Sequence, residues 1–429
     1  MCADGYGVVS AVVVEAVADQ RRATRTERIS RLRAVAGRPL LIAVVATVVL
    51  RVITEFIALN AVYGASFPHV VARDPHVLID VLNHWDAGYY LAIAQHGYPT
   101  AHAAGLPAGS LRRFVAFGPV YPAAIWLVHS VTGIGSAVVG QLISALAMVA
   151  ALAGLVHLTE LDAERSRAGV AVTLLVAFPT AFFLLTDYPD SLALALAVWS
   201  FIAARHRHWV LAGLCAAGAF MTKYYLAIVV VALVVEVWQS RSSRGESDEQ
   251  SRGEGGRWPR RSAVAATAVV VPTVVVAAIW MVVCSHRYGD ALAFVHVQSA
   301  WHRHVAWPWT LIAHTSGDLI HLRFLDTHTA SIMELLDTVT LVGLTVVTVY
   351  TWVRIRRSYG ILLALGLATF AFQNMLYNDT REVIALFPVF IGGARWVDGH
   401  PWRERVVLAC FIPTGYFLIT RFVTGSFAG

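Results

Sequence analysis

The sequence predicts an all-α, polytopic membrane protein with about eleven transmembrane helices. Of its 429 residues, 57% are hydrophobic and only 14% are charged, and the mean hydropathy is +0.63. Apolar runs close to the ~20 residues that a membrane-spanning helix needs recur along the chain. Arginine is concentrated in alternate connections between these runs. Together these observations exclude an ordinary soluble domain.

The spans are predicted from the apolar runs. One further apolar stretch, 117–131, contains two prolines and is interpreted as a juxtamembrane or re-entrant element, because proline interrupts a regular helix. The eleven spans lie near 40–62, 136–158, 169–186, 191–204, 209–223, 225–239, 263–284, 333–353, 359–377, 383–396 and 405–423.

The distribution of positive charge orients these spans. With a cytoplasmic N-terminus, inner segments hold 23 of the 33 Lys and Arg residues, as the positive-inside rule requires. Counting 117–131 as a crossing would place the later arginine-rich loops outside. The prediction is therefore a basic cytoplasmic segment at 1–39 and a transmembrane domain at 40–429. Two long outer loops lie at about 63–135 and 285–332, and a disordered cytoplasmic linker lies at about 240–262.

Composition also limits the classes of partner that the protein can bind. The net charge of +6 reflects asymmetry across a bilayer, so we expect lipid contact and no nucleic-acid partner. The four cysteines show no CxxC or Cys/His spacing, which argues against a disulfide framework or a zinc site. The preference for arginine over lysine suggests a bacterial chain.

The segment 83–99 is the most informative stretch of the first outer loop. It places Trp85 and Asp86 directly before two tyrosines. In a helix, Asp86, Tyr89, Tyr90 and Ile93 would share one face. Alternatively, Asn83 and Asp86 could act only as a helix-capping pair.

Four further polar groups stand at the predicted outer ends of spans, and each has a structural alternative. The acidic pair, Asp187 and Asp190, could cap the fourth span, and Lys223 could extend toward the membrane interface. The group around Trp301 and His302 could be an interfacial aromatic belt. Asp379 and Arg381 could pair in a tight turn. The groups are Asp187 with Asp190; Lys223; Trp301, His302 and Arg303; and Asp379 with Arg381.

These groups suit transfer of a group from a phosphate to a hydroxyl. A hydroxyl acceptor needs a positioned carboxylate to take its proton, which Asp86 could supply. A phosphate leaving group needs cations, which Arg381, Lys223 or Arg303 could supply. No cofactor is required, although Mg²⁺ or Mn²⁺ could join Asp86 to Asp187 or Asp190, because hard cations prefer carboxylates.

Several short motifs, in order along the chain, resemble the PIG-V family of GPI mannosyltransferase II and its bacterial relatives, within the GT-C membrane glycosyltransferases. They span most of 40–395. The matching pieces are Trp85-Asp86, Tyr90, Ile93 and Gly97-Tyr98; Phe117, Pro119 and Tyr121-Pro122; 178–183; Tyr188-Pro189-Asp190-Ser191-Leu192; Met221-Thr222-Lys223; Gly289-Asp290, Phe294, Gln298 and Trp301; and Arg381 with Phe387-Pro388.

The resemblance implies a GT-C fold with juxtamembrane helices in the first outer loop. It implies inverting transfer of mannose from a polyprenyl-phosphate-mannose donor, with Asp86 as catalytic base. Substrate contacts are then expected from Trp85, Tyr90, the segment Tyr188–Ser191 and Arg381. The chain departs from the family where Lys223 replaces an arginine and Asp190 a glutamate, so sugar and acceptor stay open. The acceptor would be a lipid, glycan or protein hydroxyl at the extracytoplasmic face of the plasma membrane.

The alternative function is a transporter or flippase of a lipid-linked sugar. Transporters usually place ionisable groups at mid-membrane and contain internal repeats. Here the ionisable groups lie mostly at predicted outer ends, and the sequence contains no repeat. Release of polyprenyl phosphate from the donor would distinguish the two functions.

Overall fold

The computed structural model describes residues 38–99, 113–162, 165–242, 260–320, 329–376 and 378–426. Across these ranges every regular element is helical, apart from an isolated bridge between Val305 and Gln373. The all-α prediction is confirmed for this part of the chain. Most of the segments predicted at 1–39 and 240–262 lies outside it, as do 100–112 and 321–328 of the two outer loops.

Within these described ranges, five helices are long and apolar enough to cross a membrane, which supports the polytopic prediction. The first occupies 38–63 and continues through a 3-10 turn into α2 (Phe67–Arg73). The others are α7 (Ser136–Asp162), α12 (Arg260–Tyr288), α15 (Thr329–Arg354) and α19 (Pro401–Val423).

The remaining predicted spans are shorter helices, and two of them are interrupted. The span expected at 169–186 ends as α8 (Arg165–Val176), followed by a turn and the 3-10 helix η3 (Ala181–Leu185). Pro179 explains the break, because a residue before proline is disfavoured in helical conformation. Likewise, the span expected at 383–396 divides at Pro388 into η7 (Val383–Ala385) and α18 (Pro388–Val397).

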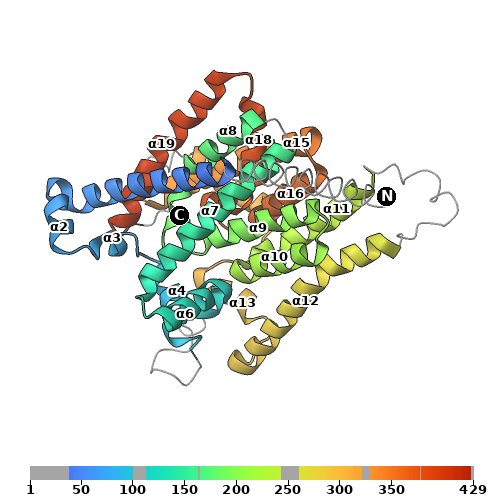
Figure 1. Ribbon diagram of the computed structural model, residues 1–429, viewed down its shortest axis with the longest axis horizontal. Coiled ribbons are helices and arrows are strands. Elements are labelled where there is room, and N and C mark those ends of the chain that lie inside the picture. The colour runs from blue at the N-terminus through green and yellow to red at the C-terminus, as the bar shows by residue number, and fades with distance from the viewer. Residues whose placement is uncertain are drawn as a thin grey trace, which may run out of the picture.

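The helix α9 (Asp190–Arg205) lies in the middle of the bundle, packed against α7 and α10 (Trp209–Thr222) (Figure 1). Small residues allow this close packing. A Cβ at Gly154 of α7 would lie 2.6 Å from the Val198 side chain of α9, and one at Gly213 of α10 would lie 2.5 Å from the Ala268 carbonyl of α12. Close backbone approach of this kind is typical of helix packing in membranes.

A network of ion pairs joins four helices at the C-terminal end of α9; we call Asp162, Arg205, Glu236, Arg356 and Tyr359 the α9 C-terminal cluster. Arg356 donates from Nε and Nη2 to the two oxygens of Glu236 at 2.8 and 2.6 Å. Arg205 and the Tyr359 hydroxyl bind the two oxygens of Asp162. Glu236 lies on α11 (Ile228–Ser242), and Arg356 directly precedes α16 (Arg357–Ala371). All these groups belong to segments that the charge distribution predicted to be on the inner side or directly beside it.

The first loop predicted to be outer folds as short helices beside the N-terminal end of α9. They are α3 (Val77–Asp80), α4 (Ala87–His96), η2 (Arg113–Ala116) and α6 (Val120–Thr132). With 13 residues, α6 is about 20 Å long, too short to cross a bilayer core. Gly118 allows this loop to pack closely against α10. A Cβ at this position would lie only 2.3 Å from the Met221 carbonyl oxygen.

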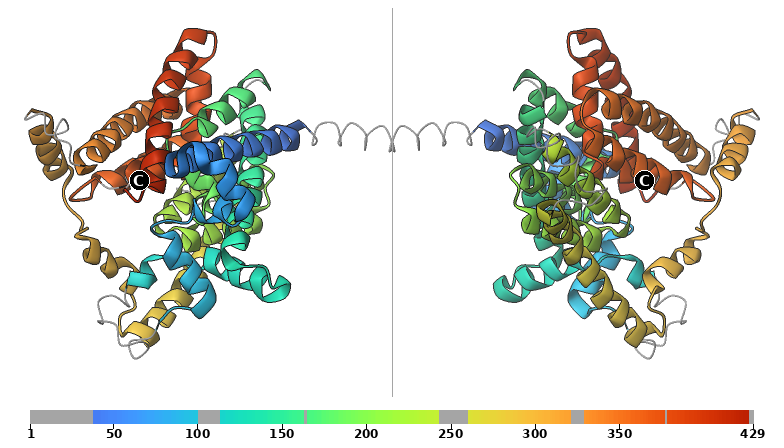
Figure 2. Two further views of the ribbon diagram at one scale, coloured as in Figure 1. Left: turned by 90° about the vertical axis from the view of Figure 1, so that its left-hand side faces the viewer. Right: turned by 90° about the vertical axis from the view of Figure 1, so that its right-hand side faces the viewer.

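The second loop predicted to be outer contains α13 (Ala293–His296), η5 (Val297–Trp301) and α14 (Pro308–Ile320). Figure 2 shows α14 at the edge of the molecule, joined to α13 by an extended stretch of chain. The turn between α16 and α18 carries α17 (Asp379–Glu382). The two loops predicted to be outer and α17 converge near the N-terminal end of α9.

Candidate active site

A cavity of about 1200 Å³ lies where the two loops predicted to be outer, the end of α10 and α17 meet. Aromatic side chains form much of its wall, including Tyr89 and Phe117, whose rings stack at 4.6 Å. Charged side chains gather at one place in it. A large, mostly apolar cavity with a few convergent polar groups is the usual form of a small-molecule site. A second hollow of about 620 Å³ lies beside the α9 C-terminal cluster.

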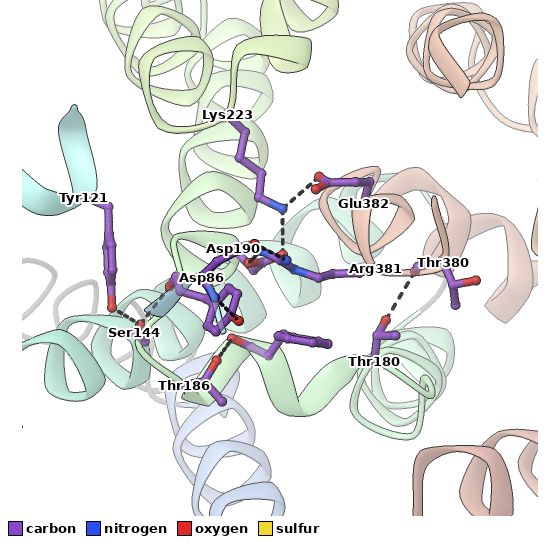
Figure 3. A network of polar contacts seen from close by, with 12 residues as sticks. Asp86, Tyr121, Ser144, Thr180, Thr186, Asp190, Lys223, Thr380, Arg381 and Glu382 are labelled. Carbon is purple, nitrogen blue, oxygen red and sulfur yellow. Dashed lines mark hydrogen bonds and ion pairs between the residues drawn. The ribbon is translucent and has the colours of Figure 1, made fainter. Parts of the chain in front are cut away.

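Five charged residues form what we call the α9 N-terminal cluster: Asp86, Asp190, Lys223, Arg381 and Glu382 (Figure 3). Asp190 is at its centre and is fully buried. It accepts hydrogen bonds from Arg381 Nε and Nη2 at 3.2 and 2.9 Å, and from Lys223 Nζ at 2.7 Å. Lys223 also donates to Glu382 at 2.8 Å. The cluster therefore sets three carboxylates against two cations.

Arg381 is buried between carboxylates and aromatic rings. Its guanidinium lies 4.4 Å from the ring centre of Tyr188 and 4.7 Å from that of Phe183. Its Nη1 atom approaches Asp86 Oδ2 at 3.6 Å. Nearby carboxylates, Asp190 foremost, overcome the opposing effect of burial and raise the pKa of Arg381, so the residue stays charged.

Asp86 differs from Asp190 in having an open carboxylate. Its side chain is 38% exposed, and the 3.6 Å approach to Arg381 is longer than an ordinary hydrogen bond. Partial removal from water raises the pKa of Asp86 above its usual value, although Arg381 opposes the shift. Asp86 precedes α4 but makes no side-chain capping hydrogen bond, so the capping alternative is wrong for this residue.

Most of the predicted site residues line the cavity. Trp85, Asp86, Tyr90, Lys223, Trp301, Arg303 and Arg381 do so, and Asp190 lies directly behind Lys223 and Arg381. Lys223 is buried and held by two carboxylates, so it does not extend toward the membrane interface. Arg381 likewise pairs with Asp190 across 191 positions of sequence, instead of merely closing a local turn.

Two predicted site residues are placed elsewhere. Asp187 is fully buried against α7, where Gln141 Nε2 donates to its Oδ2 at 3.0 Å. Burial raises the pKa of Asp187 to about 7. His302 ends η5 with a left-handed backbone and is not among the residues that line the cavity. We therefore remove both residues from the candidate site.

Two further carboxylates belong to the surroundings of the site and are not among the predicted site residues. Glu382 follows Arg381 directly and binds Lys223 at 2.8 Å, and its position in the polar turn after 377 is the sequence signal for it. Asp337, inside the apolar run at 333–353, accepts from the backbone and hydroxyl of Thr380 at 2.7 and 2.6 Å and so fixes the α17 turn. An isolated carboxylate in an apolar run could have pointed to it.

The option of a divalent cation gains no support from this geometry. Both Asp190 oxygens already accept hydrogen bonds from cations, and Asp187 faces α7. Among the described residues, no group of three or more His, Cys, Asp or Glu side chains could hold a metal ion.

Residues 117–246 match the family model described as dolichyl-phosphate-mannose-protein mannosyltransferase. Over this segment the chain is similar to dolichyl-phosphate-mannose-dependent mannosyltransferases. This segment begins at Phe117 in the cavity wall and contains Asp190 and Lys223, while Asp86 and Arg381 lie outside it. The enzyme class predicted from the sequence is thereby confirmed, in preference to a transporter. No curated protein and no solved structure matches the chain.

Proposed function

We propose that the protein is an inverting mannosyltransferase that moves mannose from a polyprenyl-phosphate-mannose donor to a hydroxyl acceptor, with Asp86 as the catalytic base. One observation carries the assignment of the base. Within the α9 N-terminal cluster, Asp190 is enclosed by two cations and Glu382 is held by Lys223, whereas Asp86 presents an open carboxylate to the cavity. The family match supplies the donor class.

The reaction needs one base and no covalent sugar–enzyme intermediate. Asp86 takes the proton of the acceptor hydroxyl as the hydroxyl oxygen attacks the anomeric carbon. The bond from that carbon to the phosphate oxygen breaks on the opposite face, and its electron pair leaves with polyprenyl phosphate. Because the leaving group is already a phosphate anion, no general acid is required. The anomeric configuration therefore inverts.

Cations on the cavity wall would hold the donor phosphate. Lys223 uses two of its three N–H donors on Asp190 and Glu382, which leaves one for the substrate. Arg303 lines the wall contributed by the second outer loop. Arg381 directs Nη1 toward Asp86 and contributes positive charge at the point where the proton is taken. Aromatic and apolar walls suit the sugar ring and the lipid chain.

We further propose that the cavity opens on the extracytoplasmic side, with eleven crossings in all. Ion pairs support this topology, because they join segments predicted to be inner: Arg167 binds Asp398, and Arg205 binds Asp162. The candidate active site lies at the opposite end of α9. The ordered motifs also support a PIG-V-type relation within the GT-C enzymes.

Cysteine labelling in intact cells tests the topology. In a variant without native cysteines, Ser66→Cys should react with a membrane-impermeant maleimide, and His400→Cys should react only after the membrane is permeabilised. Both positions are exposed. The reverse pattern would contradict the proposed side of the active site.

Turnover of a labelled donor tests the reaction. Purified protein is incubated with polyprenyl-phosphate-mannose and separate lipid, glycan and peptide acceptors. We expect release of polyprenyl phosphate and an α-linked product from a β-linked donor. Movement of the intact donor across vesicles without release would instead identify a flippase, and retention of configuration would exclude the single-base mechanism.

A further inference from the structure

The turn that carries Asp86 has an unfavourable backbone conformation. Trp85 has a φ angle of 57°, in the left-handed region that bulky side chains seldom adopt. A non-glycine residue stays there only where surrounding contacts hold it. The turn directly precedes α4 and the proposed base.

The hydroxyl of Tyr188 holds both sides of this turn. The Asp86 backbone N–H donates to the Tyr188 oxygen at 3.0 Å, and the Tyr188 hydroxyl donates to the His84 carbonyl oxygen at 3.0 Å. One hydroxyl thus bridges the residues before and after Trp85. Tyr188 lies 102 and 104 positions away from these partners, so the contact depends on the tertiary fold.

Tyr188 is itself rigidly placed. Its side chain is buried, and its ring packs against Phe183 and Phe422 at centroid distances of 5.1 and 6.1 Å. The face of the same ring supports the Arg381 guanidinium at 4.4 Å. A single side chain therefore contacts the backbone of Asp86 and the cation nearest to its carboxylate.

We propose that Tyr188 is a positioning residue, whose hydroxyl clamps the left-handed turn at Trp85 and so sets the direction of the Asp86 carboxylate. The inference rests on the proposed role of Asp86. Displacement of a reacting group by about 1 Å can cost on the order of 100-fold in rate. Tyr188→Phe keeps the ring beneath Arg381 and removes only the clamp. We expect it to lower kcat by about 10- to 100-fold while leaving the donor KM within about threefold.

A rescue experiment separates the clamp from general loss of packing. Asn adopts the left-handed conformation more readily than other non-glycine residues. In a Trp85→Asn background, Tyr188→Phe should therefore lower kcat by less than about threefold. In a Trp85→Phe background the aromatic side chain and its conformational preference remain, so the full effect of Tyr188→Phe should persist. Tyr359→Phe is the matched control: it also removes a hydroxyl from a fully buried ring, but in the α9 C-terminal cluster, and should leave kcat unchanged.

Hydrogen exchange gives a readout that does not depend on activity. Tyr188→Phe should speed deuterium uptake in the peptide that covers 83–90, and Tyr359→Phe should not. If the wild-type protein shows no transferase activity but Tyr188→Phe still speeds uptake, the clamp is upheld and the proposed function is rejected. Unchanged uptake and a kcat within twofold of wild type would reject the clamp, as would equal losses in the Asn and Phe backgrounds.

Discussion

The two ends of α9 carry ion networks of similar composition but different balance. At the C-terminal end, two carboxylates face two arginines, and Glu236 receives a two-pronged hydrogen bond from Arg356. At the N-terminal end, Asp190 receives the same kind of two-pronged bond from Arg381, but two further carboxylates compete for the two cations. The extra negative charge resides on groups that line the larger cavity.

This difference separates ion pairs that hold helices together from those that prepare a reaction. A balanced buried network satisfies its charges and has little to offer a ligand. An unbalanced network leaves one carboxylate able to accept a proton, and strongly perturbed groups in a cleft are typical of functional sites. Paired substitutions at the two ends can therefore test the functional assignment.

The largest difference in kcat is expected between the variants Asp86→Asn and Asp162→Asn. Loss of a general base should lower kcat by roughly 10²–10⁴-fold while the protein folds normally and binds donor. Asp162→Asn should lower the melting temperature and leave kcat per folded molecule near wild type, because its partners are Arg205 and Tyr359. Near-normal turnover of a folded Asp86→Asn enzyme would end the general-base proposal.

The next largest difference in rate per folded molecule is expected between Asp190→Asn and Glu236→Gln. Each substitution removes a buried charge that binds an arginine, and each should destabilise folding by about 3–5 kcal/mol. Thermal unfolding would measure this shared loss. Only Asp190→Asn should also lower the rate per folded molecule, since it releases Lys223 and Arg381 in the cavity. Equal activity losses at the two ends would indicate that both clusters are purely structural.

A smaller effect is expected in the pH dependence of the rate. Asp86 must be ionised to act as a base, so activity should fall as the pH drops through its pKa, which lies above the usual 3.8. The Arg381 charge favours the ionised form. Arg381→Gln should therefore raise the Asp86 pKa and move the acid limb of kcat to higher pH. Arg356→Gln is the control and should leave that limb in place.

The last prediction concerns Asp187 and affects stability alone. Its pKa of about 7 in the fold, against 3.8 normally, means that the folded state favours the protonated carboxyl. Its contribution to stability is therefore present at low pH and lost as the pH rises from about 4 through about 7. Asp187→Asn should flatten this loss, making the variant more stable than wild type above pH 7. Melting temperatures at pH 5 and pH 8 would show the difference.

Local pattern predicted the helices best where apolar runs had clear ends. The runs at 136–158, 191–204 and 209–223 correspond to α7, α9 and α10, each with ends displaced by at most four residues. The prediction of one helix over 169–186 is wrong, because Pro179 breaks the helix although the apolar run is continuous.

For the site, residue type identified Asp86, Lys223 and Arg381, but not how they pair. Asp187 and Asp190 lie three residues apart in one motif and looked equivalent. The start of α9 at Asp190 directs one carboxylate to Lys223 and Arg381, whereas the preceding turn directs the other to Gln141 on α7. Such contacts join positions 33 to 191 residues apart and arise from packing that a single sequence does not display.

The 16 residues of α9 set the distance between its two ends at about 24 Å. The hydrocarbon interior of a typical bilayer is about 30 Å thick, and any tilt would shorten the helix further along the membrane normal. Because α9 lies in the middle of the bundle, at least one of its ends then lies below the level of the lipid headgroups, inside the protein. A long-chain isoprenoid donor could bring its sugar to the N-terminal end by sideways diffusion within one leaflet.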